Sequence, residues 1–149
     1  AVLTTDAVYQ AFYDDSTARG FLHSHSYTGN PLACRAALAV LDVFERSPVL
    51  ERNRAAAARL NELNTALAAH PRVRHARQLG MIWAYDIDTQ DPGFAARYRQ
   101  AALDQGLLLR PIGNTLYFMP PYVLDEEALQ LLAAGSLKAL DVALAGGEA

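Results

Sequence analysis

Cysteine and lysine are almost absent from this sequence, and each absence limits the chemistry that the chain can carry. Cys34 is the single cysteine, so an internal disulfide is excluded, and the compartment that fits best is a reducing cytoplasm. Lys138 is the single lysine. Any chemistry that needs a lysine amine would therefore depend on this one side chain.

Strong net charge and long apolar runs are also lacking. The formal net charge is -3, so bulk electrostatics do not favour nucleic acid or an anionic membrane as partners. We find no apolar run that approaches membrane-spanning length, and no charged and apolar segments that mark a secretory signal. The 149 residues are 52% hydrophobic and 19% charged, which is enough for a globular chain with a real core.

The N-terminal third predicts two helices separated by a polar loop. Residues 1–5 are apolar and β-branched, which predicts a buried strand that is already under way at the first residue. We therefore expect the chain to be a piece of a longer protein. Asp6 can cap a short helix that extends to about Tyr13. Asn30 as a cap and Pro31 at the first helical position predict a second helix, which stops near Ser47.

The rest of the chain predicts a compact α+β layer, with helices on one face of a small, mostly antiparallel sheet. The expected elements are a helix over 49–69, strands over 73–76 and 80–87, a helix over 94–105, strands over 107–110 and 115–119, and a helix over 125–145. The first part lacks enough strands for a sheet of its own, so it is expected to complete a larger domain. We place the boundary between residues 1–47 and residues 48–149.

The loop over residues 21–30 is rich in hydroxyls and imidazoles, and a helix begins directly after it. Hydroxyls, backbone donors and a helix N-terminus together suit an anion such as phosphate. The alternative is a capped loop whose polar side chains satisfy only its own backbone. A metal site at His23 and His25 lacks further ligands at useful spacing. A nucleophilic Ser24 or Ser26 lacks the flanking glycines of a nucleophile elbow.

Arg110 stands at the end of an expected strand, immediately before the turn Pro111–Asn114. A guanidinium at such a place can hold a carboxylate with two hydrogen bonds. Tyr117 lies in the next strand and can point to the same side. The alternative is a surface arginine and a tyrosine that only packs on the sheet.

Together these two segments resemble the class III aminotransferases, which are fold-type I pyridoxal-phosphate (PLP) enzymes of the α/β class. The resemblance implies the tail of a large PLP-binding domain followed by a small C-terminal α+β domain. In this family a threonine of the loop contacts the cofactor phosphate of the neighbouring subunit, and Ser26 stands at its position. The resemblance places His25 beside the cofactor and Ser24 among the residues that line the substrate. It also implies a homodimer with a shared cofactor site.

The segment from Arg110 to Tyr122 resembles one branch of that family more specifically. Enzymes of this branch transfer an amino group from S-adenosylmethionine to 8-amino-7-oxononanoate, in biotin synthesis. The resemblance assigns Arg110 to the carboxylate of the oxononanoate and Tyr117 to the substrate pocket. The family's cofactor-binding lysine lies upstream of the matched region, and Lys138 does not correspond to it. We therefore expect no catalytic lysine in this chain and no transamination by the chain alone. Two alternatives stay open, another class III ω-amino acid aminotransferase and a non-catalytic α+β interaction module.

Overall fold

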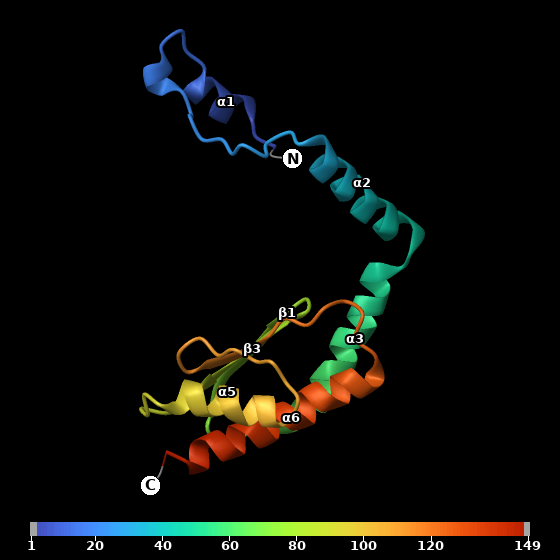
Figure 1. Cartoon of the computed structure of the whole chain (residues 1–149), viewed down its shortest axis with the longest axis vertical. Coiled ribbons are helices and arrows are strands. Elements are labelled where there is room, and N and C mark those ends of the chain that lie inside the picture. Colours follow the sequence, from blue (N-terminus) through green and yellow to red (C-terminus); the bar gives the residue numbers. More distant parts are fainter. Residues whose placement is uncertain (1–2, 148–149) are drawn as a thin grey trace. The chain divides into compact units, whose positions relative to one another are not determined.

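The computed structural model describes residues 3–147 and divides the chain into two compact units, Ala1–Asp42 and Val43–Ala149 (Figure 1). Unit 1 contains the helix α1 (Asp6–Phe12), the single 3-10 turn η1 (Thr17–Arg19) and most of the helix α2 (Pro31–Arg46). Residues 3–5, which were expected to be a strand, have no regular structure, and residues 1–2 lie outside the described residues. Thr4 and Thr5 are β-branched, but residues 3–42 contain no strand with which they could pair, so they form no ladder.

The start of α2 follows from local chemistry, as the sequence predicts. The side-chain oxygen of Asn30 accepts hydrogen bonds from the backbone N–H groups of Leu32 and Ala33, at 2.9 and 3.1 Å. Pro31 takes the first helical position, where no backbone donor is needed. The start of α1 differs from the prediction by one residue, because the capping side chain is Thr5 rather than Asp6.

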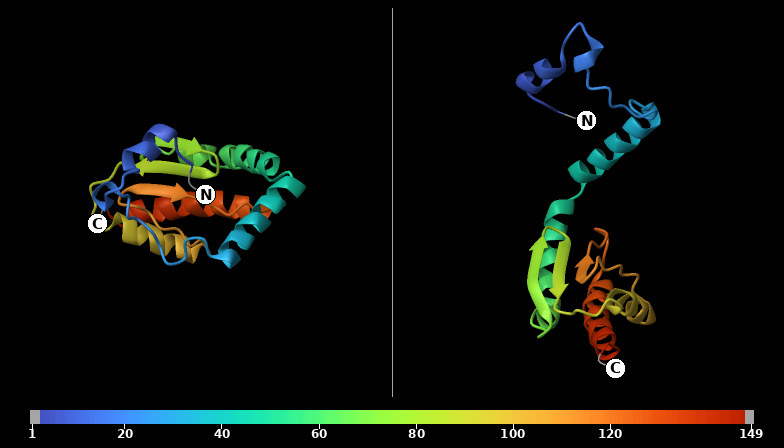
Figure 2. Two further views of the ribbon diagram at one scale, coloured as in Figure 1. Left: turned by 90° about the horizontal axis from the view of Figure 1, so that it is seen from above. Right: turned by 90° about the vertical axis from the view of Figure 1, so that its left-hand side faces the viewer.

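Unit 2 is an antiparallel sheet with four helices. Its elements in order are α3 (Val49–Leu63), α4 (Thr65–Ala68), β1 (Val73–Leu79), β2 (Ile82–Ile87), α5 (Phe94–Asp104), β3 (Thr115–Phe118) and α6 (Glu126–Ala145). The strands lie in the order β1-β2-β3, and both pairings are antiparallel (Figures 1 and 2). The predicted α+β layer with a small antiparallel sheet is therefore confirmed.

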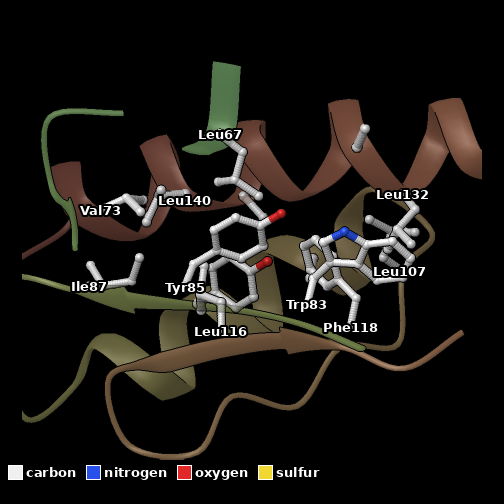
Figure 3. Close-up of a cluster of buried hydrophobic side chains, with 14 of the residues drawn as sticks. Leu67, Val73, Trp83, Tyr85, Ile87, Leu107, Leu116, Phe118, Leu132 and Leu140 are labelled. Atoms are coloured by element: carbon white, nitrogen blue, oxygen red, sulfur yellow. The ribbon is translucent and has the colours of Figure 1, made fainter. Parts of the chain in front are cut away.

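The core of unit 2 lies on one face of this sheet. Trp83, Tyr85 and Ile87 alternate along β2 and are buried, whereas Ile82 is exposed, as expected for a strand with one solvated face. They share one hydrophobic cluster with side chains from every helix of the unit, including Leu60, Leu67, Phe94 and Leu140. Figure 3 shows α6 crossing this face, with Leu132 and Leu140 directed toward the aromatic rings of the sheet.

Three predicted elements need correction. Residues 107–110 form no strand. The helix expected over 49–69 is interrupted at Asn64, which separates α3 from α4. β1 extends to Leu79 because its pairing with β2 shifts between Arg74 and Arg77, where His75 adopts a positive φ of 48°; an added residue of this kind lets a strand continue past an interruption.

The helix α6 also differs from the expectation that no segment reaches membrane-spanning length. By length and composition alone, its 20 residues are apolar enough to cross a membrane. In the structure 44% of that apolar window is buried inside the protein. Eight of its residues, among them Leu129, Leu132 and Leu140, are buried, so its apolar character is accounted for by the core of unit 2.

Candidate functional site

A cavity of about 550 Å³ lies beside β3 in unit 2 and contains both residues predicted for the acid site. Two arginines and a tyrosine contribute its polar atoms, and the other lining residues are apolar. The cavity is lined by Arg99, Leu108, Leu109, Arg110, Tyr117, Phe118, Met119, Pro120, Pro121 and Leu132. The structure thus brings Arg110 and Tyr117 together in one cavity.

A tight turn between Arg110 and Tyr117 explains why both residues line the same cavity. The backbone of Ile112 and that of Thr115 exchange two hydrogen bonds of 2.9 Å, and Gly113 between them has a φ of 57° that favours glycine. Counting outward two residues on each side of this bridge gives Arg110 and Tyr117. Both residues stand two positions from the bridge, and both line the cavity.

Asn114 attaches this turn to the rest of the sheet. Its side-chain amide donates to the backbone oxygen of Thr89 at 2.7 Å, and its own backbone oxygen accepts from the N–H of Ile87 at 2.8 Å. The turn is therefore held from outside the hairpin as well as from within. The position of Arg110 relative to Tyr117 depends on these contacts.

The electrostatics of the cavity favour an anion. Its lining includes two guanidinium groups and no carboxylate. Within residues 3–147, Arg110 is exposed and its guanidinium has neither an ion pair nor a hydrogen bond. The walls of leucine, phenylalanine, methionine and proline suit an aliphatic chain. An organic acid with an apolar body matches both features.

The predicted phosphate loop lies in unit 1, and Ser24, His25 and Ser26 are all exposed there. A turn follows His25, whose backbone oxygen accepts from the N–H of Thr28 at 2.9 Å. The hydroxyl of Thr28 accepts from the N–H of His25 at 3.3 Å. In the described part of the chain, the Ser26 hydroxyl has no partner, so it can still donate to a phosphate oxygen.

Two features of this loop narrow its chemistry. The His25 ring stacks on Tyr27, with ring centroids 5.0 Å apart and an interplanar angle of 6°, so one face of the imidazole is already covered. The Asn30 side chain occupies the N–H groups of Leu32 and Ala33 at the start of α2. A phosphate here would therefore be held by the Ser26 hydroxyl rather than by those helix donors. Among residues 3–147 there is no group of three or more metal-binding side chains.

Comparison with known proteins identifies the family. A model of the family described as aminotransferase class-III matches residues 1–140. The chain belongs to the class III aminotransferase family. Its relatives include the adenosylmethionine-8-amino-7-oxononanoate aminotransferases of Helicobacter pylori, at 41% identity over 95% of this chain, and of Synechococcus elongatus, at 39% over 93%. These matches cover 34% and 33% of the relatives, so the chain spans about a third of their length.

Solved structures agree with this family. The adenosylmethionine-8-amino-7-oxononanoate aminotransferase of Methanocaldococcus jannaschii superposes with a TM-score of 0.77 at 29% identity, over 93% of this chain and 34% of that chain. An omega transaminase from Pseudomonas jessenii, solved in complex with PMP, shares the fold at 21% identity, with a TM-score of 0.76 over 87% of this chain and 30% of that one. The fold is that of the fold-type I PLP aminotransferases, as the sequence resemblance implied.

The single lysine of this class III chain is Lys138. It is exposed on α6 and is not among the residues that line the cavity. The sequence predicted Arg110 and Tyr117 at one site, and both line this cavity. The same reasoning missed Arg99, which lines the cavity from α5 but belongs to no recognisable motif.

Proposed function

We propose that this chain provides the acid-binding part of a PLP-dependent aminotransferase of biotin synthesis. The reaction transfers an amino group from S-adenosylmethionine to 8-amino-7-oxononanoate and gives 7,8-diaminononanoate. The observation that carries the proposal is that Arg110 and Tyr117 both line one largely apolar cavity whose lining contains no carboxylate. The names of the relatives at 41% and 39% identity support this choice of substrates over another ω-amino acid.

Arg110 and Tyr117 have distinct roles in the proposal. The Arg110 guanidinium binds the carboxylate of the oxononanoate with two hydrogen bonds, and Tyr117 orients the aliphatic chain beside it. Fixing the acid end in this way sets the position of the reacting end of the substrate. The leucine and proline side chains of the cavity offer apolar contacts to the aliphatic chain of the substrate.

The polar loop supplies the contact to the cofactor. The free Ser26 hydroxyl donates to the phosphate group of PLP, and His25 and Ser24 line the cofactor and the substrate next to it. PLP, when bound, supplies the electron sink that allows an amino group to be exchanged. We propose a cytoplasmic homodimer, in which Ser26 of one subunit completes the phosphate site of the other. Since the only lysine lies outside the cavity, we expect no transamination by residues 1–149 alone.

The test is the substitution Arg110→Ala in the full-length protein. Truncating one partner of a charge pair that is buried when the substrate binds costs about 2–5 kcal/mol. The kcat/KM for the oxononanoate should therefore fall by the factor that corresponds to this free energy. The half-reaction with S-adenosylmethionine should keep its rate, because the proposal assigns Arg110 to the carboxylate of the oxononanoate and not to the amino donor. Arg52→Ala, an exposed arginine on α3 outside the cavity, is the matched control. Unchanged oxononanoate kinetics in Arg110→Ala would remove this residue from the site.

The choice of amino donor is tested separately. S-adenosylmethionine alone should convert the bound cofactor to its aminated form, and pre-steady-state spectroscopy measures this conversion. If only ω-amino acids do so, the protein is another class III aminotransferase and the biotin-pathway assignment is wrong.

A further inference from the structure

Four arginines in the described part of the chain have no partner, and two of them share one cavity. Within residues 3–147, four arginines lack any side-chain hydrogen bond or ion pair, namely Arg52, Arg54, Arg99 and Arg110. The other arginines have partners; Arg97, for example, donates to the backbone oxygen of Ala143. Arg99 and Arg110 both line the cavity beside β3. Two unpaired cations in one apolar cavity call for a physical explanation.

The fold brings the two arginines together from different elements. Arg99 lies on α5 and is exposed, whereas Tyr98 and Ala102 of the same helix are buried. The chain then turns at Gly106, which has a φ of 78°, and the N–H of Leu107 donates to the backbone oxygen of Ala102 at 2.9 Å. The segment that ends in Arg110 therefore starts against the last turn of α5. This return path is what places Arg99 and Arg110 on one cavity.

Two like charges that line one cavity repel each other, although both arginines are exposed and water screens this repulsion. A bound carboxylate removes this cost, because its two oxygens can accept hydrogen bonds from both guanidinium groups. A hydroxyl-terminated molecule of the same length leaves both cations unpaired. An ammonium-terminated molecule adds a third positive charge.

We propose that Arg99 is a second carboxylate-binding residue, which acts with Arg110 and makes the cavity selective for acids over amines and neutral chains. This proposal rests on the proposed function, since it concerns the same acid-binding cavity. Arg110 fixes the register of the carboxylate from the turn before β3. Arg99 reaches it from α5 and sets how strongly the cavity discriminates against a substrate whose far end carries an amine.

The experiment measures binding of octanoate to the 149-residue chain, with 1-octanol and octylamine as probes of equal chain length. Arginine side-chain NMR signals of Arg99 and Arg110 should shift with octanoate and not with the other two. Arg99→Gln should weaken octanoate binding roughly tenfold, the scale of one charge-assisted hydrogen bond. Arg99→Lys, which keeps the charge but not the fork, should recover part of this loss. Arg52→Gln should bind octanoate as the unchanged chain does.

The outcomes separate the two proposals. If Arg110→Gln weakens octanoate binding and Arg99→Gln does not, Arg99 has no role and the acid site at Arg110 stands. If neither substitution changes the affinity, or octanoate does not bind, both the second contact and the acid site are wrong. Fluorescence of the buried Trp83 reports whether each variant retains the folded core, so a loss of binding through unfolding is recognised.

Discussion

Asp86 connects all three strands of the sheet through a single carboxylate. From the middle strand β2 it accepts two hydrogen bonds from Arg77 of β1, at 2.8 and 3.0 Å, and one from Thr115 of β3, at 2.8 Å. The hydrogen bond from Arg77 is the largest cause that holds the pKa of Asp86 below its ordinary value of 3.8, and the bond from Thr115 acts in the same direction. Thr115 also forms the backbone bridge with Ile112 in the turn that follows Arg110. Thr115 therefore links the stability of the sheet to the candidate site.

The substitution Asp86→Asn should remove a pH-dependent part of the stability. A carboxyl whose pKa is lower in the folded protein stabilises the fold above its unfolded pKa, and this contribution disappears as the pH falls through the folded pKa. The side chain is partly exposed, so the loss at pH 7 should be no more than about 1 kcal/mol. Urea unfolding at pH 7 and at acid pH, below the folded pKa, measures it.

The two proteins should differ at pH 7 and converge in acid. Asp88→Asn is the matched control, because Asp88 pairs with Arg74 at 3.0 Å but, within residues 3–147, its side chain has no hydrogen bond to β3. It should reduce stability less than Asp86→Asn does. Equal stability of Asp86→Asn and the unchanged chain at pH 7 would show that the three-strand contact contributes nothing.

At the scale of elements, α6 provides an internal comparison between burial and exposure. Leu140 is 0% exposed and packs in the core, whereas Leu131 of the same helix is 47% exposed. Leu140→Ala should lower the free energy of unfolding by about 2–5 kcal/mol, since it leaves a cavity among close-packed side chains. Leu131→Ala should change it by no more than about 0.5 kcal/mol. Urea titration of both variants tests whether this face of α6 carries the core, and similar losses would contradict it.

α6 also shows how closely the elements that hold the candidate site approach one another. A Cβ added at Gly135 would lie 2.7 Å from Leu107 and 3.3 Å from Gln105. The absence of a side chain at this position lets the segment after α5 pack against α6. The path from Leu107 to Arg110 therefore begins at a helix surface with no room for a larger residue.

The elements that the sequence predicts correctly are those set by local chemistry. The Asn30 cap starts α2, the Asp125 side chain caps α6 by accepting from the N–H of Ala128 at 2.9 Å, and alternation along β2 identifies its buried face. Each of these signals depends on residues a few positions apart. The elements that the sequence predicts wrongly depend on partners that lie far away along the chain. The segment 107–110 has the composition of a strand, but no neighbouring strand pairs with it.

The candidate site follows the same division. Arg110 and Tyr117 were predicted together because a short turn separates them. Arg99 was missed because its place in the cavity depends on the packing of α5 and on the turn at Gly106, and neither is visible as a motif. Whether Ser26 meets a cofactor stays a prediction, since that depends on groups beyond the chain.

At the scale of the whole molecule, the two units differ in how they treat apolar surface. Unit 2 has a continuous core, whereas no described residue of unit 1 is buried. The exposed side chains of unit 1 include large apolar ones on α1 and α2, such as Val8, Phe12, Leu38 and Leu41. Large exposed apolar side chains in such number are typical of faces that pack against further protein.

The 149-residue chain should therefore self-associate as its concentration rises, because contact between copies removes this apolar surface from water. Sedimentation velocity over a range of concentrations should show a rising mean sedimentation coefficient. The matched control is residues 43–149, which retain the core but lack the exposed faces of unit 1, and their coefficient should stay constant. Leu41→Glu in the complete chain should weaken the association, since a charge on α2 must then be desolvated in the contact. A concentration-independent monomer would show that these exposed side chains do not suffice to drive association. Association of residues 43–149 alone would instead assign the contact to unit 2.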